Sequence, residues 1–177
     1  MNDRCREPLK DVESIRHIVN DIAILAGLDE NQLDTVFSVL QYMSFARGSF
    51  IFEKGDYPQD IYVILKGSVR LLLDIGGEYL EKMVFTRGQC FGETSVIGIE
   101  THTASIVAAE DTELILLSRK ELFRFYKTDK DIFCMLVLNI AREACRRLNK
   151  TDEILLHYFA HLDHSDDHVG SMHPALK

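Results

Sequence analysis

The sequence predicts a mainly β fold with flanking helices, in which a barrel or sandwich of short strands lies between N-terminal helices and one long C-terminal helix. Three observations predict this fold. Residues 42–118 consist of short runs rich in Ile, Val, Leu, Phe and Tyr that turn residues, mostly glycine, separate. Residues 11–40 carry apolar side chains at helical spacing. Residues 128–162 continue without Gly or Pro, with apolar side chains three or four positions apart.

The N-terminal segment predicts two helices. Residues 11–26 form the first, which Gly27 ends, with a stripe of Val12, Ile15, Val19, Ile22 and Leu25. Asp29 caps the second, because Gln32 stands where a capping box requires it. The second stripe comprises Leu33, Val36, Phe37 and Leu40. We expect these helices to pack rather than to carry chemistry.

The central region predicts an all-β sandwich or barrel. Its candidate strands are SFIFEKG, DIYVILKG, SVRLLLDI, EYLEKMVF, TASIVAAE and TELILLS. The turns between them fall at Gly48, Gly55-Asp56, Gly67-Ser68, Gly76-Gly77, Gly88 and Glu110-Asp111. Many short strands with regular turns are typical of this class.

A capping box of Ser118 and Glu121 predicts the return to helix. The long stripe that follows comprises Phe133, Val137, Ile140, Ala144, Leu148, Thr151, Leu155, Tyr158 and Leu162. A helix of about 30 residues spans about 45 Å, which is more than a small barrel can bury along one side. We therefore expect a homodimer whose two copies meet through residues 133–162. Residues 163–177 are polar and predict a disordered tail.

Composition and the absence of certain motifs disfavour several classes of protein. The chain has 177 residues, enough for one ordinary domain with an appended helix. No apolar run approaches the roughly 20 residues that a membrane span needs, and the net charge of −8 disfavours nucleic acid as the main partner. The four cysteines form no Cys-x-x-Cys pair and the N-terminus has no apolar signal region, which favours a reduced, cytoplasmic protein. No hydrolase or P-loop signature occurs, so we expect no enzymatic activity.

The segment GQCFGETSVIGIETHTAS, residues 88–105, concentrates the residues suited to ligand binding. Gly92 permits close approach of the backbone, and a helix that begins at Glu93 favours an anion at its first N–H groups. Ser95 and Thr103 offer hydroxyl donors. Glu93 is an acceptor and suits sugar hydroxyls. The combination describes a nucleotide phosphate with its ribose, although a carboxylate that only caps a turn is the alternative.

The glycine framework identifies a family. Gly48-x-x-Ile51-x-x-x-Gly55-Asp56, then Ile61-Tyr62-Val63-Ile64-x-x-Gly67, then Gly88-x-x-Phe91-Gly92-Glu93, resembles the cyclic nucleotide-binding domain. The resemblance covers about residues 28–162, and the end of the long helix is similar to the dimer helix of the cAMP receptor protein group. It implies a jelly-roll β-barrel with a phosphate-binding cassette. We expect an N-terminal helical segment at 1–27, the β-roll domain at 28–127, a dimerisation helix at 128–162 and a tail at 163–177.

The resemblance also implies the ligand contacts. Glu93 matches the glutamate that binds the ribose 2′-hydroxyl, and the backbone of residues 92–95 matches the turn around the cyclic phosphate. Thr103 matches a small residue beside the phosphate, and Thr151 matches the dimer-helix hydroxyl that meets the purine. The predicted ligand-binding residues are Gly92, Glu93, Thr94, Ser95, His102, Thr103, Ala104 and Thr151.

His102 departs from the family pattern. The pattern reads Arg-x-Ala-Ser or Arg-x-Ala-Thr, and this chain reads His102-Thr103-Ala104-Ser105. Arginine offers a permanent charge and two parallel donors, whereas histidine offers one donor and a charge that depends on pH. The loss of a charge-assisted pair costs about 1.5–3 kcal/mol, or roughly ten- to hundredfold in affinity.

Two features of the C-terminal region bear on DNA and metal binding. Residues after Leu162 have no apolar periodicity for a helix-turn-helix, so we expect no direct DNA binding. Four histidines could form a metal site with Asp163, Asp166 and Asp167, but we predict no metal site there; they are His157, His161, His164 and His168.

The sequence thus predicts a homodimeric sensor for cAMP or cGMP, without a further cofactor, that signals to an unidentified downstream protein through its long helix. The threonine at Thr103 leaves the choice of base open. One alternative is a degenerate fold that serves only as a dimerisation or docking module. The other is the sensor of a transcription regulator that works through a separate DNA-binding partner.

Overall fold

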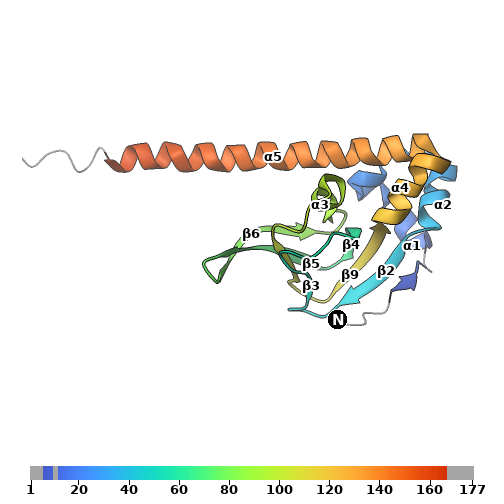
Figure 1. The fold of residues 1–177 in the computed structure, drawn as a ribbon, viewed down its shortest axis with the longest axis horizontal. Coiled ribbons are helices and arrows are strands. Elements are labelled where there is room, and N and C mark those ends of the chain that lie inside the picture. Colours follow the sequence, from blue (N-terminus) through green and yellow to red (C-terminus); the bar gives the residue numbers. More distant parts are fainter. Residues whose placement is uncertain (1–5, 10–11, 167–177) are drawn as a thin grey trace, which may run out of the picture. The chain divides into compact units, whose positions relative to one another are not determined.

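The computed structural model describes residues 6–9 and 12–166, apart from the side chains of Ser14, Tyr158 and residues 160–166. The chain divides into two compact units, Met1–Ile140 and Ala141–Lys177. The first unit contains all the strands and is shown with its helices in Figure 1.

Two antiparallel sheets form the first unit, which confirms the predicted jelly-roll fold (Figure 1). One has the order β1-β2-β9-β4-β7 and the other the order β3-β8-β5-β6. The strands are β1 (Glu7–Pro8), β2 (Gln41–Phe45), β3 (Phe50–Phe52), β4 (Asp60–Lys66), β5 (Ser68–Ile75), β6 (Glu78–Thr86), β7 (Cys90–Phe91), β8 (Ser105–Ala108) and β9 (Thr112–Ser118). Each of the six predicted runs contains a strand. Three strands lie outside the predicted runs. They are β2, which falls between the predicted second helix and the first predicted run, and the two-residue strands β1 and β7, which are too short to show a period.

Glycines at the predicted turns have the conformation that those turns need. Gly48, Gly55, Gly67, Gly76, Gly77 and Gly88 all have positive φ. At Gly88 a Cβ atom would also lie 2.6 Å from the carbonyl oxygen of Asp21. The turn after β6 therefore packs directly against the backbone of the N-terminal segment.

Two hydrophobic cores lie on the two faces of the first sheet. In β4, Tyr62 and Ile64 contribute to the core between the sheets. Ile61 and Val63 point the other way, into the core that the helices cover. Burial on both faces explains why this strand is a continuous apolar run rather than an alternating one.

The first predicted helix is broken, so the expectation of one helix over residues 11–26 is wrong. The segment contains α1 (Val12–Arg16) and two 3₁₀ turns, η1 (Val19–Asp21) and η2 (Ala23–Leu25). Ile22, between the turns, is extended with φ −89° and ψ 96°. The apolar residues are nevertheless inside, because Ile15, Ile22 and Leu25 are buried. A segment that wraps around a sheet buries more than one side, which a single helical stripe cannot do.

The caps of the other helices are confirmed. In α2 (Glu30–Phe37) the Asp29 carboxylate accepts from the Gln32 N–H at 2.8 Å, and the Gln32 side chain accepts from the Asp29 N–H at 3.0 Å. In α4 (Arg119–Thr128) the Ser118 hydroxyl accepts from the Glu121 N–H at 3.2 Å.

The long helix α5 spans Lys130–Asp166 rather than residues 128–162. Its start is displaced because Asp129 is extended and its carboxylate accepts from the N–H groups of Asp131 and Ile132, both at 3.1 Å. The helix then continues through residues 163–166, where we had expected a tail. Residues 167–177 and the side chains of His161, His164 and His168 lie outside the described part of the chain.

The first turns of α5 belong to the helical core of the first unit. Ile132, Leu136 and Ile140 are buried there. This corrects part of the predicted dimer stripe, since Ile140 is covered by its own chain. Asn139 is also buried, and its side-chain amide donates to the carbonyls of Ile24 at 3.2 Å and Ala26 at 2.7 Å.

We expect Asn139→Ala to lower the free energy of unfolding by about 1–3 kcal/mol, because it leaves the carbonyls of Ile24 and Ala26 without their amide donor. Chemical denaturation measures the change. Asn149→Ala, at an exposed position of the same helix, is the control and should have little effect. Equal effects of the two substitutions would contradict the role given to Asn139.

The described part of the second unit is the rest of α5, from Ala141 to Asp166. Glu143 pairs with Arg146 at 2.5 Å and with Arg147 at 3.4 Å. The exposed large apolar side chains of this part of α5 are Leu148, Ile154, Leu155, Leu156 and Phe159. No described helix is both long and apolar enough to cross a membrane.

Candidate ligand-binding site

The predicted site begins at the turn between β7 and the short helix α3 (Glu93–Gly98). Gly92 forms this turn with φ 83°, in the left-handed region. A Cβ atom there would lie 3.1 Å from the carbonyl oxygen of Asp60 and 3.2 Å from the Tyr62 ring. Glycine is therefore required both for the conformation and for the close approach of the turn to β4.

The tight turn carries Glu93 inside the domain. Glu93 is fully buried, and Val96 on the same helix packs into the helical core. Thr94 is exposed and Ser95 is half-buried. A carboxylate is costly to bury, so a buried glutamate at this position is better suited to meeting a polar group than to capping an exposed turn.

The end of α3 is strained. Ile99 has φ 57° and ψ 38°, and it is the one non-glycine residue with positive φ among the residues described. A β-branched residue in this region costs about 1–2 kcal/mol, and such outliers gather at ligand-binding segments. This strain could not be predicted, because nothing in an Ile-Gly-Ile run marks which residue adopts the left-handed conformation.

The other half of the site is attached to the loop that follows β3. The His102 N–H donates to the Asp56 carbonyl at 2.9 Å, and the Gly55 N–H donates to the His102 carbonyl at 2.8 Å. The Ser105 hydroxyl accepts from the Lys54 N–H at 3.0 Å. Ala104 is buried and Thr103 is exposed. These bonds fix the backbone of residues 102–105 against residues 54–56.

The His102 side chain stacks on Phe52. The two ring centroids are 3.6 Å apart, the planes differ by 9°, and His102 is only 5% exposed. Burial lowers the pKa of His102 below its ordinary value of 6.5, while the nearby charge of Asp56 opposes this effect. In the ligand-free domain the imidazole therefore favours its neutral form.

One aromatic cluster links the two halves. The Phe52 ring is 5.8 Å from Tyr62 and 6.0 Å from Phe91, and Tyr62 stacks on Phe91 at 5.0 Å. The Gly92 turn contacts Tyr62, and His102 contacts Phe52. The structure thus brings Gly92 and His102 to the same cluster. Sequence reasoning missed Phe52, which no motif distinguishes from the other aromatic residues of its strand.

Thr151 is not placed relative to these residues. It lies in the second unit, where its hydroxyl donates to the Arg147 carbonyl at 3.0 Å. Its contact with a purine stays a prediction.

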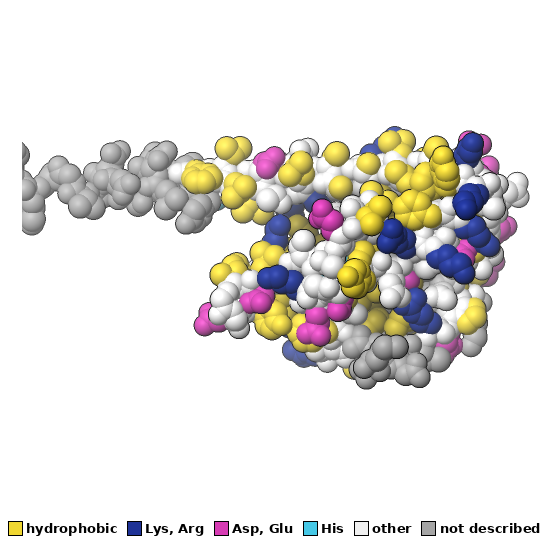
Figure 2. Space-filling model, viewed as in Figure 1, with side chains coloured by type: hydrophobic (Ala, Val, Ile, Leu, Met, Phe, Trp, Pro, Cys, Tyr) yellow, Lys and Arg dark blue, Asp and Glu magenta, His cyan; other side chains and the backbone are white. Residues whose placement is uncertain are grey.

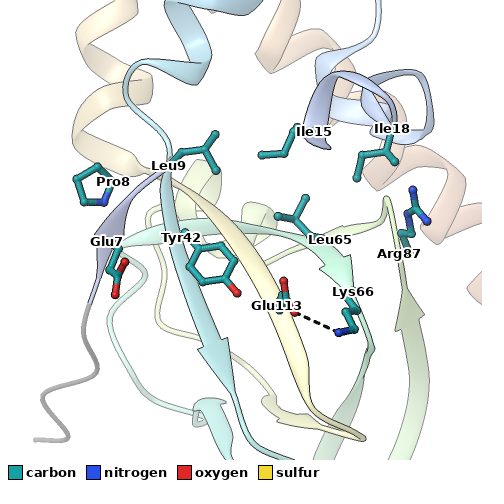
Figure 3. A pocket seen from close by; sticks show the side chains of 10 residues that line it. All are labelled: Glu7, Pro8, Leu9, Ile15, Ile18, Tyr42, Leu65, Lys66, Arg87 and Glu113. Atoms are coloured by element: carbon teal, nitrogen blue, oxygen red, sulfur yellow. Dashed lines mark hydrogen bonds and ion pairs between the residues drawn. The ribbon is translucent and has the colours of Figure 1, made fainter. Parts of the chain in front are cut away.

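The pocket in Figure 3, of about 570 Å³, lies on the other face of the first sheet. Leu9, Ile15 and Leu65 form its apolar wall, and none of the predicted ligand residues lines it. Burial raises the pKa of Tyr42 at its edge, and the carboxylate of Glu113 raises it further. That carboxylate also pairs with Lys66 at 3.4 Å. The pocket is therefore a space between the first sheet and the N-terminal segment, and it is not the predicted ligand site.

The lowered pKa of His102 predicts a pH dependence of stability. As pH falls below about 6.5, the unfolded chain takes up the proton before the folded domain does. The free energy of unfolding should therefore decrease from pH 6.5 downward, until pH passes the lower pKa of the folded state. Chemical denaturation at a series of pH values measures this slope.

The substitution His102→Phe keeps a ring on Phe52 and should remove this contribution to the slope. His17→Phe, at an exposed histidine, is the control and should retain it. The same slope in the His102→Phe protein would contradict the burial of a neutral imidazole.

Comparisons with known proteins agree with this geometry. The sequence model of the cyclic nucleotide-binding domain matches residues 42–129. The chain is 32% identical over 127 residues to the cyclic AMP receptor protein of Thermus thermophilus, covering 71% of this chain and 57% of that protein.

Solved structures show the same fold. The crystal structure of Thermus thermophilus catabolite activator protein has a TM-score of 0.67 at 31% identity, over 77% of this chain and 63% of that one. A cyclic nucleotide-binding domain from Methylobacillus flagellatus has a TM-score of 0.77 at 22% identity, over 88% of each chain. The chain therefore belongs to the cyclic nucleotide-binding domain family and is homologous to the cAMP receptor proteins.

Proposed function

We propose that this chain is a regulatory sensor that binds a cyclic nucleotide, cAMP or cGMP, at residues 92–105 and has no catalytic activity of its own. The observation that carries the proposal is the burial of Glu93 behind the left-handed Gly92 turn, inside a domain of the cyclic nucleotide-binding family. The chain spans only 57% of the length of the Thermus receptor protein, so the proposal covers ligand binding and not the full activity of that protein.

The chemistry of the segment supports a nucleotide. The Glu93 carboxylate accepts hydrogen bonds and is suited to the ribose 2′-hydroxyl. The backbone of residues 92–95, with the hydroxyls of Ser95 and Thr103, supplies donors for the cyclic phosphate. Because residue 102 is a histidine, stacked on Phe52, this phosphate site lacks the permanent charge that an arginine would supply.

Signalling would proceed through α5. Asn139 fastens the first turns of this helix to η2, so helix and N-terminal segment would move together when the cassette closes on its ligand. The exposed apolar side chains after residue 141 would pair with a second copy of the chain. In that dimer Thr151 would approach the purine, and the moving helix would act on a downstream protein.

Calorimetric titration with cAMP and with cGMP tests the proposal, with AMP as the acyclic control. We expect one cyclic nucleotide to bind per chain, with a dissociation constant between about 10 μM and 1 mM because the arginine is absent. AMP should bind more weakly still. No heat change with either cyclic nucleotide at millimolar concentration would contradict the proposal.

The burial of His102 against Phe52 favours a second candidate function. If the phosphate contact is lost altogether, the same fold serves as a dimerisation or docking module. The titration separates the two functions, since a docking module binds no nucleotide but keeps its assembly.

The dimer makes its own prediction. Leu148 is 60% exposed and stands seven positions before Leu155, the spacing of a coiled-coil seam. Leu148→Asp would place an unsatisfied charge in that seam, so sedimentation velocity should show a monomer. The control Asn149→Asp, at the adjacent exposed position, should remain dimeric. A dimer that survives Leu148→Asp would place the interface elsewhere.

A further inference from the structure

A groove of about 960 Å³ lies where the start of β4, the end of β9 and the first turn of α4 meet. Four basic and two acidic side chains line it: Arg6, Arg119, Lys120, Arg124, Asp60 and Glu121. The whole chain has a net charge of −8, so the groove is a positive region on an acidic protein. Figure 2 shows several Lys and Arg side chains on the side of the domain that carries α4.

Both acidic groups of the groove are already engaged. The Arg6 guanidinium donates to the two carboxylate oxygens of Asp60, at 3.1 Å and 2.7 Å, and Asp60 is fully buried. Arg124 pairs with Glu121 at 2.8 Å. These pairs hold the groove's edges in place and neutralise its carboxylates.

The groove has two further cations, Arg119, which is half-buried, and Lys120. Among the residues described, Arg119 and Lys120 form no ion pair with a carboxylate. Arg119 instead lies over the Phe123 ring, 5.8 Å from its centroid, which orders the guanidinium without neutralising it. Lys120 is exposed. The groove therefore presents two adjacent positive charges, and the Phe123 ring holds the guanidinium of Arg119 in place.

Aromatic side chains border these charges. Tyr57 is 82% exposed, and Phe123 is also exposed. Exposed Tyr and Arg side chains around a groove are typical of the residues that dominate binding at protein interfaces. The combination fits a partner that offers carboxylates beside apolar side chains.

We propose that this groove docks an acidic segment of a partner protein, with carboxylates at Arg119 and Lys120 and an apolar side chain between Tyr57 and Phe123. Nucleic acid is disfavoured because two unengaged cations neutralise few phosphates, whereas they suffice for the one or two carboxylates of a short acidic segment. None of residues 92–105 lines the groove, and the proposal does not rest on nucleotide binding.

Fluorescence anisotropy with the full chain tests the proposal. The probe is a short labelled peptide in which Glu and Asp alternate with Leu and Phe, and the control peptide has Gln and Asn in place of the acids. We expect the acidic peptide to bind at low ionic strength, the control peptide not to bind, and the binding to weaken at about 1 M salt, where the Debye length is about 3 Å.

Matched variants locate the site. Arg119→Glu with Lys120→Glu should weaken the acidic peptide at least about fivefold. The control Arg47→Glu with Lys82→Glu carries the same charge change at exposed positions outside the groove and should bind as the unaltered chain does. Thermal unfolding of both double variants checks that each is folded.

Three results would overturn the proposal. They are no binding of the acidic peptide, equal weakening by the two double variants, and tighter binding of a single-stranded oligonucleotide of the same charge than of the peptide. The last would identify the groove as a nucleic-acid site.

Discussion

Glu93→Ala protein should bind cyclic nucleotide about ten- to hundredfold more weakly than the unaltered chain. Glu93 is fully buried behind the Gly92 turn, and in the proposed complex its carboxylate is the acceptor for the ribose 2′-hydroxyl. Removal of a hydrogen bond to a charged group costs about 1.5–3 kcal/mol, or roughly ten- to hundredfold in affinity. The affinity of this site is already low because the arginine is absent, so the further loss should be easy to detect. Calorimetry measures the effect.

Two further variants make this experiment specific. Glu100→Ala removes an exposed carboxylate from the same segment and should leave the affinity unchanged. Glu93→Gln preserves the shape of the side chain but not its charge, and should bind more weakly than the unaltered chain. Unchanged affinity in the Glu93→Ala protein would contradict the assignment of the ribose contact.

His102→Arg should tighten cyclic nucleotide binding by about ten- to hundredfold. An arginine supplies the permanent charge and paired donors that the phosphate lacks, and its planar guanidinium can take the place of the imidazole on the Phe52 ring. The backbone of His102 is fixed by hydrogen bonds to residues 55 and 56, which do not involve its side chain, so the substitution should leave them in place.

The pH dependence provides a second test of the same residue. Burial lowers the pKa of His102 in the ligand-free domain, and a bound phosphate would raise it, because a nearby anion stabilises the imidazolium. Affinity of the unaltered chain should therefore increase as pH falls through the histidine range. The His102→Arg protein should show no such dependence. Absence of binding by this protein at millimolar ligand would favour the docking module.

Most of the fold could be predicted because turns and strands leave local signals. A glycine that must adopt positive φ, such as Gly67 or Gly88, is visible in the sequence, and so is a cap such as Asp29. The break at Ile22 could not be predicted, since it depends on how the segment wraps around a sheet formed by distant residues. The same holds for Ile140, which has the spacing of a dimer stripe but is buried by its own chain.

The candidate site was predicted in part for a related reason. Gly92 and Glu93 belong to a short motif, and their turn and burial agree with the role that the resemblance implied. The environment of His102 depends on Phe52, which is distant in sequence, and only the pairing of β3 with β8 brings their neighbourhoods together. The absence of the arginine could be read from the sequence, but the stacking of His102 on Phe52 could not.

Amide chemical shifts during a titration with cAMP or cGMP would test the central claim most directly. The account predicts that the largest changes fall at residues 92–96 and 102–105, with smaller changes at Phe52 and Asp56, which touch His102. Changes confined to the residues that line the pocket of Figure 3, or no changes at millimolar nucleotide, would contradict it.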